Sequence, residues 1–286
     1  MPPDVQFRHA GPRELVYAHR ELKQGHAYFV ASQANRPIRV DASFRVGGFE
    51  AEFWRPDTGV AEPAPYSRDG DRTRVPLELD PYGSVFIVFR HASDVATRQM
   101  APEPLQEIAR FDAGWRVDFQ KGRGAPDSIV LNTLESLTSH GDPGVRYFSG
   151  VATYTREIEV ERSAIESAGR IWLDLGGIRD LAQVFVNGRE AGIVWKRPFC
   201  LDIRPHLKPG RNELEVRVAN TWRNRVVGDK VMASENPVSR HNPVEGGLFQ
   251  MIGTAITKDT PLLDSGLLGP VVLSVQGRQG PMTNQK

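Results

Sequence analysis

The sequence predicts an all-β protein with two β-sandwich domains. Three observations support this: apolar and polar residues alternate along many short segments, turn-forming residues separate these segments, and residues 20–92 show no helical period of useful length. The 286 residues include 27 glycines and 21 prolines, and extra turn formers are typical of chains with many short strands. A chain of this length forms one large domain or two of ordinary size.

The first domain is expected within residues 1–95, as a small antiparallel sandwich. From Ile38 to Val46 every second residue is apolar. A period of two places these residues on one face of a strand, toward the core. Residues 84–89 are apolar on both faces, as in a central strand. Residues 96–110 contain closely spaced prolines and predict an extended linker.

The second domain is expected over residues 111–276, with a tail over 277–286. Asn187 and Gly188 directly follow an apolar segment, and both accept the positive φ angles of a type I′ turn, so they predict a hairpin. On the return strand we interpret Ala191, Ile193 and Trp195 as a core stripe. The alternative is that Trp195 offers its indole face to a sugar ring.

The overall charge gives no support to several classes of function, although it excludes few of them. Basic residues number 36 and acidic residues 35, a net charge of +1, which favours neither a nucleic-acid nor a membrane partner. Cys200 is the single cysteine, and its strand-like context predicts a buried, inert thiol rather than a nucleophile. No signal-peptide pattern opens the chain. The localisation therefore stays open between an unexported chain and a piece separated from its export signal.

No motif in the sequence supplies a complete catalytic apparatus. Phosphate-binding loops, the nucleophile elbow of α/β-hydrolases and the zinc-binding H-E-x-x-H pattern are all absent from the sequence. Two close pairs, His140 with Asp142 and His241 with Glu245, could serve metal binding or acid–base chemistry. We favour turn and surface roles for both pairs. No cofactor is required by any motif.

A stretch of over forty residues, from Trp222 to Gly266, interrupts the strand pattern. Loops longer than ~12–15 residues are uncommon in compact domains and are often functional. An indole can stack on a sugar ring, and amide, guanidinium and carboxylate groups can pair with hydroxyls. We therefore predict a sugar-binding site formed by Asn220, Trp222, Arg223, Asn224, Arg225 and Asp229. The alternatives are a floppy insertion, or polar residues that fix the loop onto the sandwich.

Several motifs of the second segment resemble the galactose-binding-like jelly roll that accompanies β-galactosidase-type glycoside hydrolases. They lie at residues 174–176, 184–188, 198–199, 207–212 and 214–220. Three longer runs, at 146–154, 220–229 and 261–271, resemble the C-terminal region of glycoside hydrolase family 106, the α-L-rhamnosidases. In the first segment, residues 19–20, 28–31, 53–59 and 84–90 resemble the sandwich that follows the catalytic barrel in that family.

The resemblance implies a function that the chain does not carry by itself. Members of the family hold their catalytic glutamates and a calcium site in a (β/α)₈ barrel, which needs ~200–250 residues, and no such pattern is present here. No catalytic residue can therefore be carried over, and calcium is possible only through the resemblance. The implied ligand is a rhamnose-containing glycan, and the family is commonly periplasmic or secreted.

Three functions stay open at this point. The first is a non-catalytic carbohydrate-binding or scaffolding C-terminal region of an α-L-rhamnosidase-like hydrolase. The second is a subunit that completes a separately encoded catalytic barrel. The third is a free-standing glycoside hydrolase with a site of its own, which needs a pair of carboxylates facing each other across a cleft.

Overall fold

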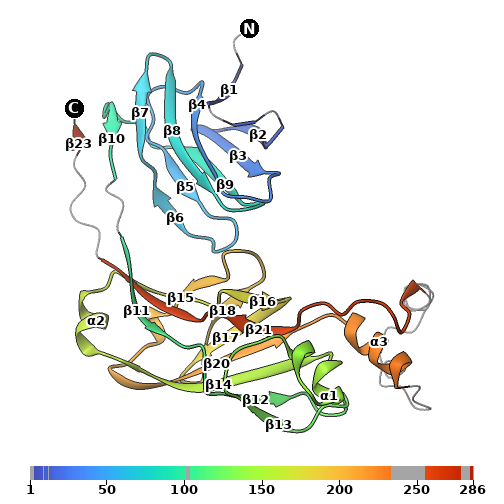
Figure 1. Ribbon diagram of the computed structural model, residues 1–286. Coiled ribbons are helices and arrows are strands. Elements are labelled where there is room, and N and C mark those ends of the chain that lie inside the picture. Colours follow the sequence, from blue (N-terminus) through green and yellow to red (C-terminus); the bar gives the residue numbers. More distant parts are fainter. Residues whose placement is uncertain are drawn as a thin grey trace. The chain divides into compact units, whose positions relative to one another are not determined.

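A computed structural model describes residues 3–8, 10–11, 13–100, 104–232, 255–277 and 284–285. The contacts between Cα atoms divide the chain into two compact units. One comprises Met1–Glu103 with Gln279–Lys286, and the other comprises Pro104–Arg278. Both units consist of antiparallel β-sheets, and the helices of the described residues all lie in the second unit (Figure 1). The predicted all-β fold is confirmed.

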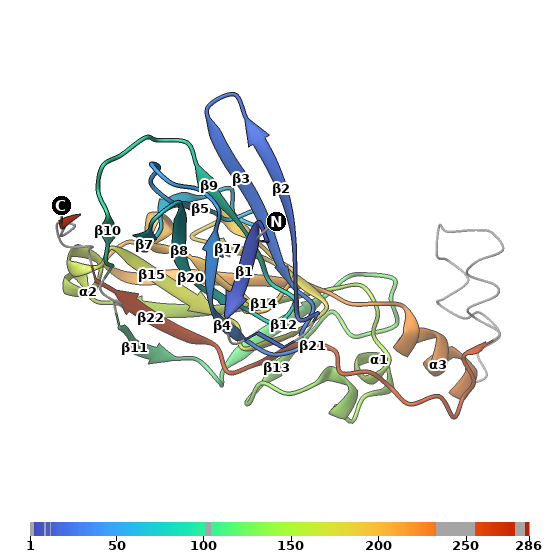
Figure 2. The same cartoon turned by 90° about the horizontal axis from the view of Figure 1, so that it is seen from above.

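The first unit contains a six-stranded and a five-stranded sheet. The six-stranded sheet has the order β1-β4-β8-β7-β10-β23, with strands Val5–Arg8, Ile38–Phe44, Arg72–Leu79, Tyr66–Asp69, Thr97–Arg98 and Asn284–Gln285. The five-stranded sheet has the order β2-β3-β9-β5-β6, with strands Leu15–Leu22, Gly25–Ser32, Ser84–Phe89, Glu52–Trp54 and Ala61–Pro63. In this second sheet β2 and β3 form a long hairpin, whose strands lie side by side in Figure 2.

The alternating pattern of β4 fills the core of the first unit as predicted. Ile38, Val40, Ala42 and Phe44 are at most 5% exposed, whereas Arg39 and Asp41 between them are exposed. The strand β9, apolar on both faces, pairs with β3 on one side and β5 on the other, so it is central, as expected.

Residues 96–110, expected as a linker, contain two strands. The strand β10 pairs with β7 in the first unit, and β11 (Leu105–Arg110) pairs with β22 in the second. The expected tail, 277–286, includes β23, which pairs with β10. The extents of linker and tail therefore differ from the expectation, because strand pairing depends on partners far away in the sequence, which local proline content does not reveal.

The second unit contains a six-stranded, a four-stranded and a two-stranded sheet. The first has the order β13-β12-β14-β20-β17-β18, with strands Ser128–Leu131, Trp115–Phe119, Val151–Val160, Gly210–Ala219, Leu181–Val186 and Arg189–Val194. The second has the order β11-β22-β15-β19, where β22, β15 and β19 are Val272–Gln276, Arg170–Asp174 and Cys200–Asp202. The third pairs β16 with β21, which are Gly177–Arg179 and Gly266–Gly269.

Short helices connect these strands. The α-helices are α1 (Pro143–Arg146), α2 (Arg162–Ser167) and α3 (Arg223–Val231), and the 3₁₀ helices are η1 (Leu137–Ser139) and η2 (Arg204–His206). None of the helices in the described part of the chain is long and apolar enough to cross a membrane.

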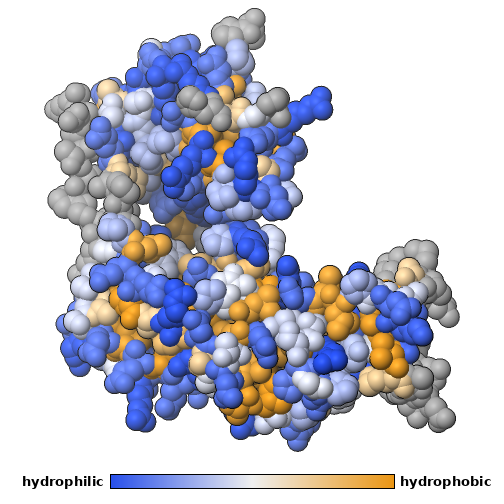
Figure 3. All heavy atoms as spheres, viewed as in Figure 1, coloured by the Kyte–Doolittle hydropathy of each residue, from blue (hydrophilic) through white to orange (hydrophobic). Residues whose placement is uncertain are grey.

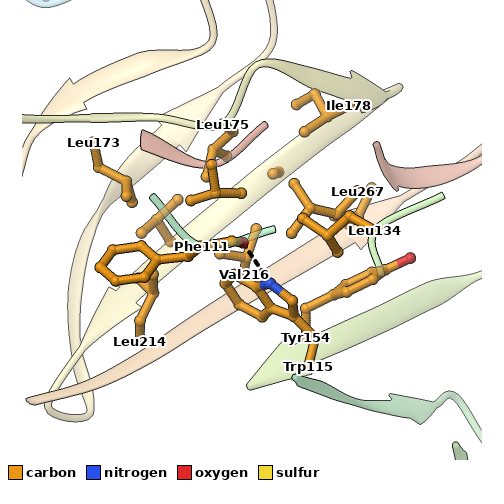
Figure 4. Close-up of a cluster of buried hydrophobic side chains, with 14 of the residues drawn as sticks. Phe111, Trp115, Leu134, Tyr154, Leu173, Leu175, Ile178, Leu214, Val216 and Leu267 are labelled. Atoms are coloured by element: carbon orange, nitrogen blue, oxygen red, sulfur yellow. Dashed lines mark hydrogen bonds between the residues drawn. The ribbon is translucent and has the colours of Figure 1, made fainter. Parts of the chain in front are cut away.

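The core of the second unit lies between its two larger sheets and is built around Trp115. Its indole is fully buried, and its Nε1–H donates a hydrogen bond to the carbonyl oxygen of Phe111 at 2.9 Å (Figure 4). Tyr154 packs edge-on against this indole, with 6.5 Å between the ring centroids. Leu173 from the four-stranded sheet and Val216 from the six-stranded sheet reach the same cluster (Figure 4).

The hairpin between β17 and β18 forms at the predicted residues. Asn187 and Gly188 have φ angles of 53° and 74°, as a type I′ turn requires. The core stripe predicted on the return strand is wrong for Ile193 and Trp195, which are 56% and 63% exposed, whereas Ala191 is partly buried and packs against the core. A β-bulge shifts the register of the hairpin, so that Val194 faces the core instead, since one extra residue exchanges the two faces of a strand.

Candidate functional site

The stretch that begins at Trp222 starts with a helix, where the sequence predicted a loop. Helix α3 covers Arg223–Val231, and Trp222 precedes it without a side-chain capping bond. The helix is short, and too few apolar residues recur at the helical period of 3.6 residues. The sequence pattern was therefore too weak to predict a helix. Residues 233–254 lie outside the described residues, and with them His241 and Glu245.

The two asparagines of the candidate site hold main-chain segments together. The side chain of Asn220 accepts the N–H of Gly150 at 2.9 Å and donates to the carbonyl of Phe148 at 2.9 Å and to the hydroxyl of Ser265 at 2.6 Å. The side chain of Asn224 donates to the carbonyl of Leu263 at 2.7 Å and accepts its N–H at 2.9 Å. Both amide groups are thus engaged within the protein, which favours a structural role for them.

Arg225 and Asp229 form a buried ion pair on α3. Nη2 of the guanidinium lies 2.6 Å from Oδ1 of the carboxylate, and the two side chains are only 2% and 5% exposed. A spacing of four residues brings them together on one face of the helix. A buried pair cannot reach a sugar without opening the helix packing, so these two residues also act as structure in this conformation.

Asn220, Trp222 and Arg223 are the partly exposed members of the candidate site, and of these the amide of Asn220 is already engaged within the protein. The guanidinium carbon of Arg123 lies 4.7 Å from the centroid of the Trp222 ring, a cation–π contact that covers one face of the indole. Trp222 and Arg223 are both partly buried, and the guanidinium of Arg223 donates to the carbonyl of Pro261 at 3.2 Å. A sugar would have to stack on the other face of Trp222.

Helix α3 packs against the chain next to α1, and both helices lie at the same end of the second unit in Figures 1 and 2. A Cβ atom on Gly228 would lie 2.4 Å from both Cβ and Cγ of Tyr147, so the glycine permits a close approach. Val226, Val227 and Ile256 form a small buried cluster there, with Tyr147 packed against it.

Tyr147, Arg123 and Ser265 complete this end of the sandwich, yet the sequence did not point to them. Tyr147 and Ser265 lie in the runs 146–154 and 261–271 that carry the family resemblance, but no pattern assigned these residues or Arg123 to this site. They come from separate segments, the closest of them 45 residues from Asn220, and no local pattern reveals such a contact.

The remaining sequence candidates have local roles. Oδ1 of Asp142 accepts the N–H of Gly144 at 2.6 Å and caps α1, while Nδ1 of His140 accepts the N–H of Asp142 at 3.1 Å. Cys200 forms no disulfide and is half-buried, not fully buried as expected. Among the described residues, no three histidine, cysteine or acidic side chains gather in a way that could hold a metal ion.

Comparison with known proteins identifies two family models. A model of alpha-L-rhamnosidase, Glyco_hydro_106, matches residues 1–68. A model of the glycosyl hydrolase 2 galactose-binding domain-like module matches residues 145–244. The predicted resemblance to glycoside hydrolase family 106, with a galactose-binding-like module in the second unit, is confirmed.

Two relatives extend the similarity. The solved structure of a rhamnosidase from Novosphingobium sp. PP1Y is 39% identical, with a TM-score of 0.84, and the match covers 95% of this chain and 25% of that one. A putative beta-glucuronidase from Formosa agariphila is 31% identical over 195 residues, which cover 63% of this chain and 16% of that protein. The chain thus spans a quarter or less of the length of these two relatives.

Proposed function

We propose that this chain is a non-catalytic scaffolding and carbohydrate-binding C-terminal region of an α-L-rhamnosidase-like glycoside hydrolase that acts on rhamnose-containing glycans. The similarity to the Novosphingobium rhamnosidase over 95% of the chain supports the choice of enzyme class. The described residues form antiparallel sandwiches without the alternating strands and helices of a (β/α)₈ barrel, which supports the non-catalytic role.

The scaffolding role is supported mainly by the contacts of the polar side chains around α3, which bind other parts of the protein. Asn220 and Asn224 bond to main-chain groups of two distant segments, and Arg225 and Asp229 are buried against each other. These groups hold the end of the sandwich in shape, so they support scaffolding more directly than ligand binding. Any contact with a glycan at this end falls to Trp222 and Arg223.

Two variants, Asp229→Ala and Trp222→Ala, distinguish the scaffolding role from a sugar-binding site at α3. Asp229→Ala leaves Arg225 buried without its carboxylate, which typically costs ~3–5 kcal/mol, so its melting temperature should fall. Trp222→Ala removes a half-buried side chain and should lower the melting temperature much less. Weaker binding of L-rhamnose to Trp222→Ala, at an unchanged melting temperature, would support the sugar site. If the parent protein binds no rhamnose, the α3 end is architecture alone.

The non-catalytic role predicts that the chain by itself does not hydrolyse aryl α-L-rhamnosides. The measurement is release of the aryl group, with buffer and heat-denatured protein as controls. Turnover that copurifies with the chain and disappears when one of its own carboxylates is substituted would instead establish a free-standing hydrolase.

A second candidate function is a subunit that completes a separately encoded catalytic barrel. It is favoured by apolar side chains at the surface of the second unit, part of which appears as orange areas in Figure 3. Leu105, Val130 and Trp195 are 61%, 68% and 63% exposed, but only a contiguous apolar patch, and not single exposed residues, would mark a protein interface. Coexpression with a family barrel chain and size-exclusion chromatography test this role, since a barrel subunit must coelute with its barrel.

A further inference from the structure

A cavity of about 530 Å³ opens in the first unit, and none of its lining residues belongs to the second unit, which contains α3. This volume lies within the ~300–1,000 Å³ of typical small-molecule sites. Residues from both sheets of the unit line it, among them Arg39, Asp41 and Glu78 on β4 and β8, and Phe53 on β5. None of these residues belongs to the site predicted from the sequence.

The polar groups of this cavity include one carboxylate that is free for a ligand. Asp41 is exposed and makes no side-chain hydrogen bond or ion pair within the described part of the chain. Its neighbour Arg39 donates to Oε1 of Glu78 through Nε at 3.0 Å and through Nη2 at 2.8 Å. The carboxylate of Asp41 can therefore accept two hydrogen bonds from outside the protein.

The cavity lining also contains hydrogen-bond donors and apolar surface. Arg55 uses Nε to bond Oε1 of Glu62 at 3.0 Å, and a guanidinium has further N–H groups to offer a ligand. Its guanidinium carbon lies 5.1 Å from the centroid of the Phe53 ring. Phe53 and Pro76 contribute apolar surface to the lining. The lining thus contains hydrogen-bond donors, acceptors and apolar surface, the groups that the hydroxyls and C–H faces of a sugar require.

The charges of the lining decide which ligands fit. The two arginines, Arg39 and Arg55, are balanced by the two carboxylates, Asp41 and Glu78, so the cavity has no excess of positive charge to attract an anion. A phosphate or a uronic acid would meet the unpaired carboxylate of Asp41 and be repelled. We propose that this cavity is a second, independent binding site for a neutral saccharide, with Asp41 as the acceptor for a pair of adjacent hydroxyls. This proposal does not rest on the function proposed above.

The test is binding of three probes to the full chain: L-rhamnose, D-galactose and D-glucuronate, measured by saturation-transfer NMR and isothermal titration calorimetry. A neutral sugar should bind, and Asp41→Ala should weaken it about tenfold, the loss expected for a hydrogen bond to a charged group. Asp71→Ala, which removes an exposed carboxylate of the same unit outside the cavity, should leave binding unchanged.

The outcomes separate this cavity from the α3 end. Binding lost in Asp41→Ala but retained in Trp222→Ala places the sugar in the first unit. Three results would overturn the proposal: no binding of either neutral sugar, equal binding by Asp41→Ala and the parent, or tighter binding of D-glucuronate than of the neutral sugars. Because Asp41 is exposed and unpaired within the described structure, its loss should not unfold the unit, and a melting curve of the variant checks this.

Discussion

The packing of α3 predicts how the substitution Gly228→Ala changes the stability of the protein. Whether the substitution stabilises or destabilises depends on the neighbouring residue Tyr147. Gly228 lies within α3, where alanine would normally stabilise a helix by ~0.8–1.0 kcal/mol relative to glycine. Here, however, the new Cβ would lie 2.4 Å from two carbon atoms of Tyr147, whereas carbon atoms in contact are ~3.5–4.0 Å apart. The helix or the tyrosine must therefore move by about 1 Å or more.

Such overpacking costs ~1–3 kcal/mol, which outweighs the gain in helix propensity. We expect Gly228→Ala to lower the free energy of unfolding by up to ~2 kcal/mol, a shift of ~4–8 °C in melting temperature for a unit of this size. In a Tyr147→Gly background both clashing atoms are gone. The same substitution should there become neutral or stabilising, by up to ~1 kcal/mol.

The assay combines thermal unfolding with hydrogen exchange of the α3 amides, since a short helix can open locally before the unit unfolds. Gly141→Ala is the matched control, because a Cβ at Gly141 meets nothing within 4 Å, and it should change stability by no more than ~0.5 kcal/mol. An increase in stability for Gly228→Ala alone, or an equal loss in both backgrounds, would refute the packing described here.

Three further predictions follow from other parts of the molecule. Trp115→Phe should destabilise the second unit by at least ~1–3 kcal/mol in urea unfolding, because it leaves the buried carbonyl of Phe111 without its donor; an unchanged midpoint would contradict this. The pKa of Glu14 is lowered by the hydrogen bond from the N–H of Gly11 and by its pairing with Arg36. Its contribution to stability is therefore present above the unfolded carboxyl pKa and lost as pH falls through the folded one; NMR titration should find Arg36→Ala only partly restoring the ordinary pKa. Limited proteolysis should cut first between the strands β10 and β11, where the two units divide, and a chain that stays whole would argue against two independently folding domains.

Much of the fold could be predicted because strands carry their own pattern. The period of two over Ile38–Phe44 determines which residues enter the core, and Asn187 with Gly188 determines where a hairpin turns, since both depend only on neighbouring residues. The family motifs likewise lie within short runs of sequence. The all-β class and the galactose-binding-like module therefore followed from the sequence.

The candidate site depended on tertiary contacts instead. Its six residues were chosen for chemistry that suits a sugar, yet the same amides and charges equally suit bonds to a distant main chain. Only the folded structure shows that Asn224 meets Leu263 and that Arg225 meets Asp229 in a buried environment.

The exposure of Trp195 likewise could not be predicted from local sequence. The bulge in the β17–β18 hairpin shifts the strand register, so Trp195 faces outward. The sequence by itself thus determined the class of fold, the hairpin turn and the family resemblance, because each is encoded by neighbouring residues. Strand register, the packing of α3 and the free carboxylate of Asp41 were decided by tertiary structure, because each depends on residues that meet only when distant segments come together.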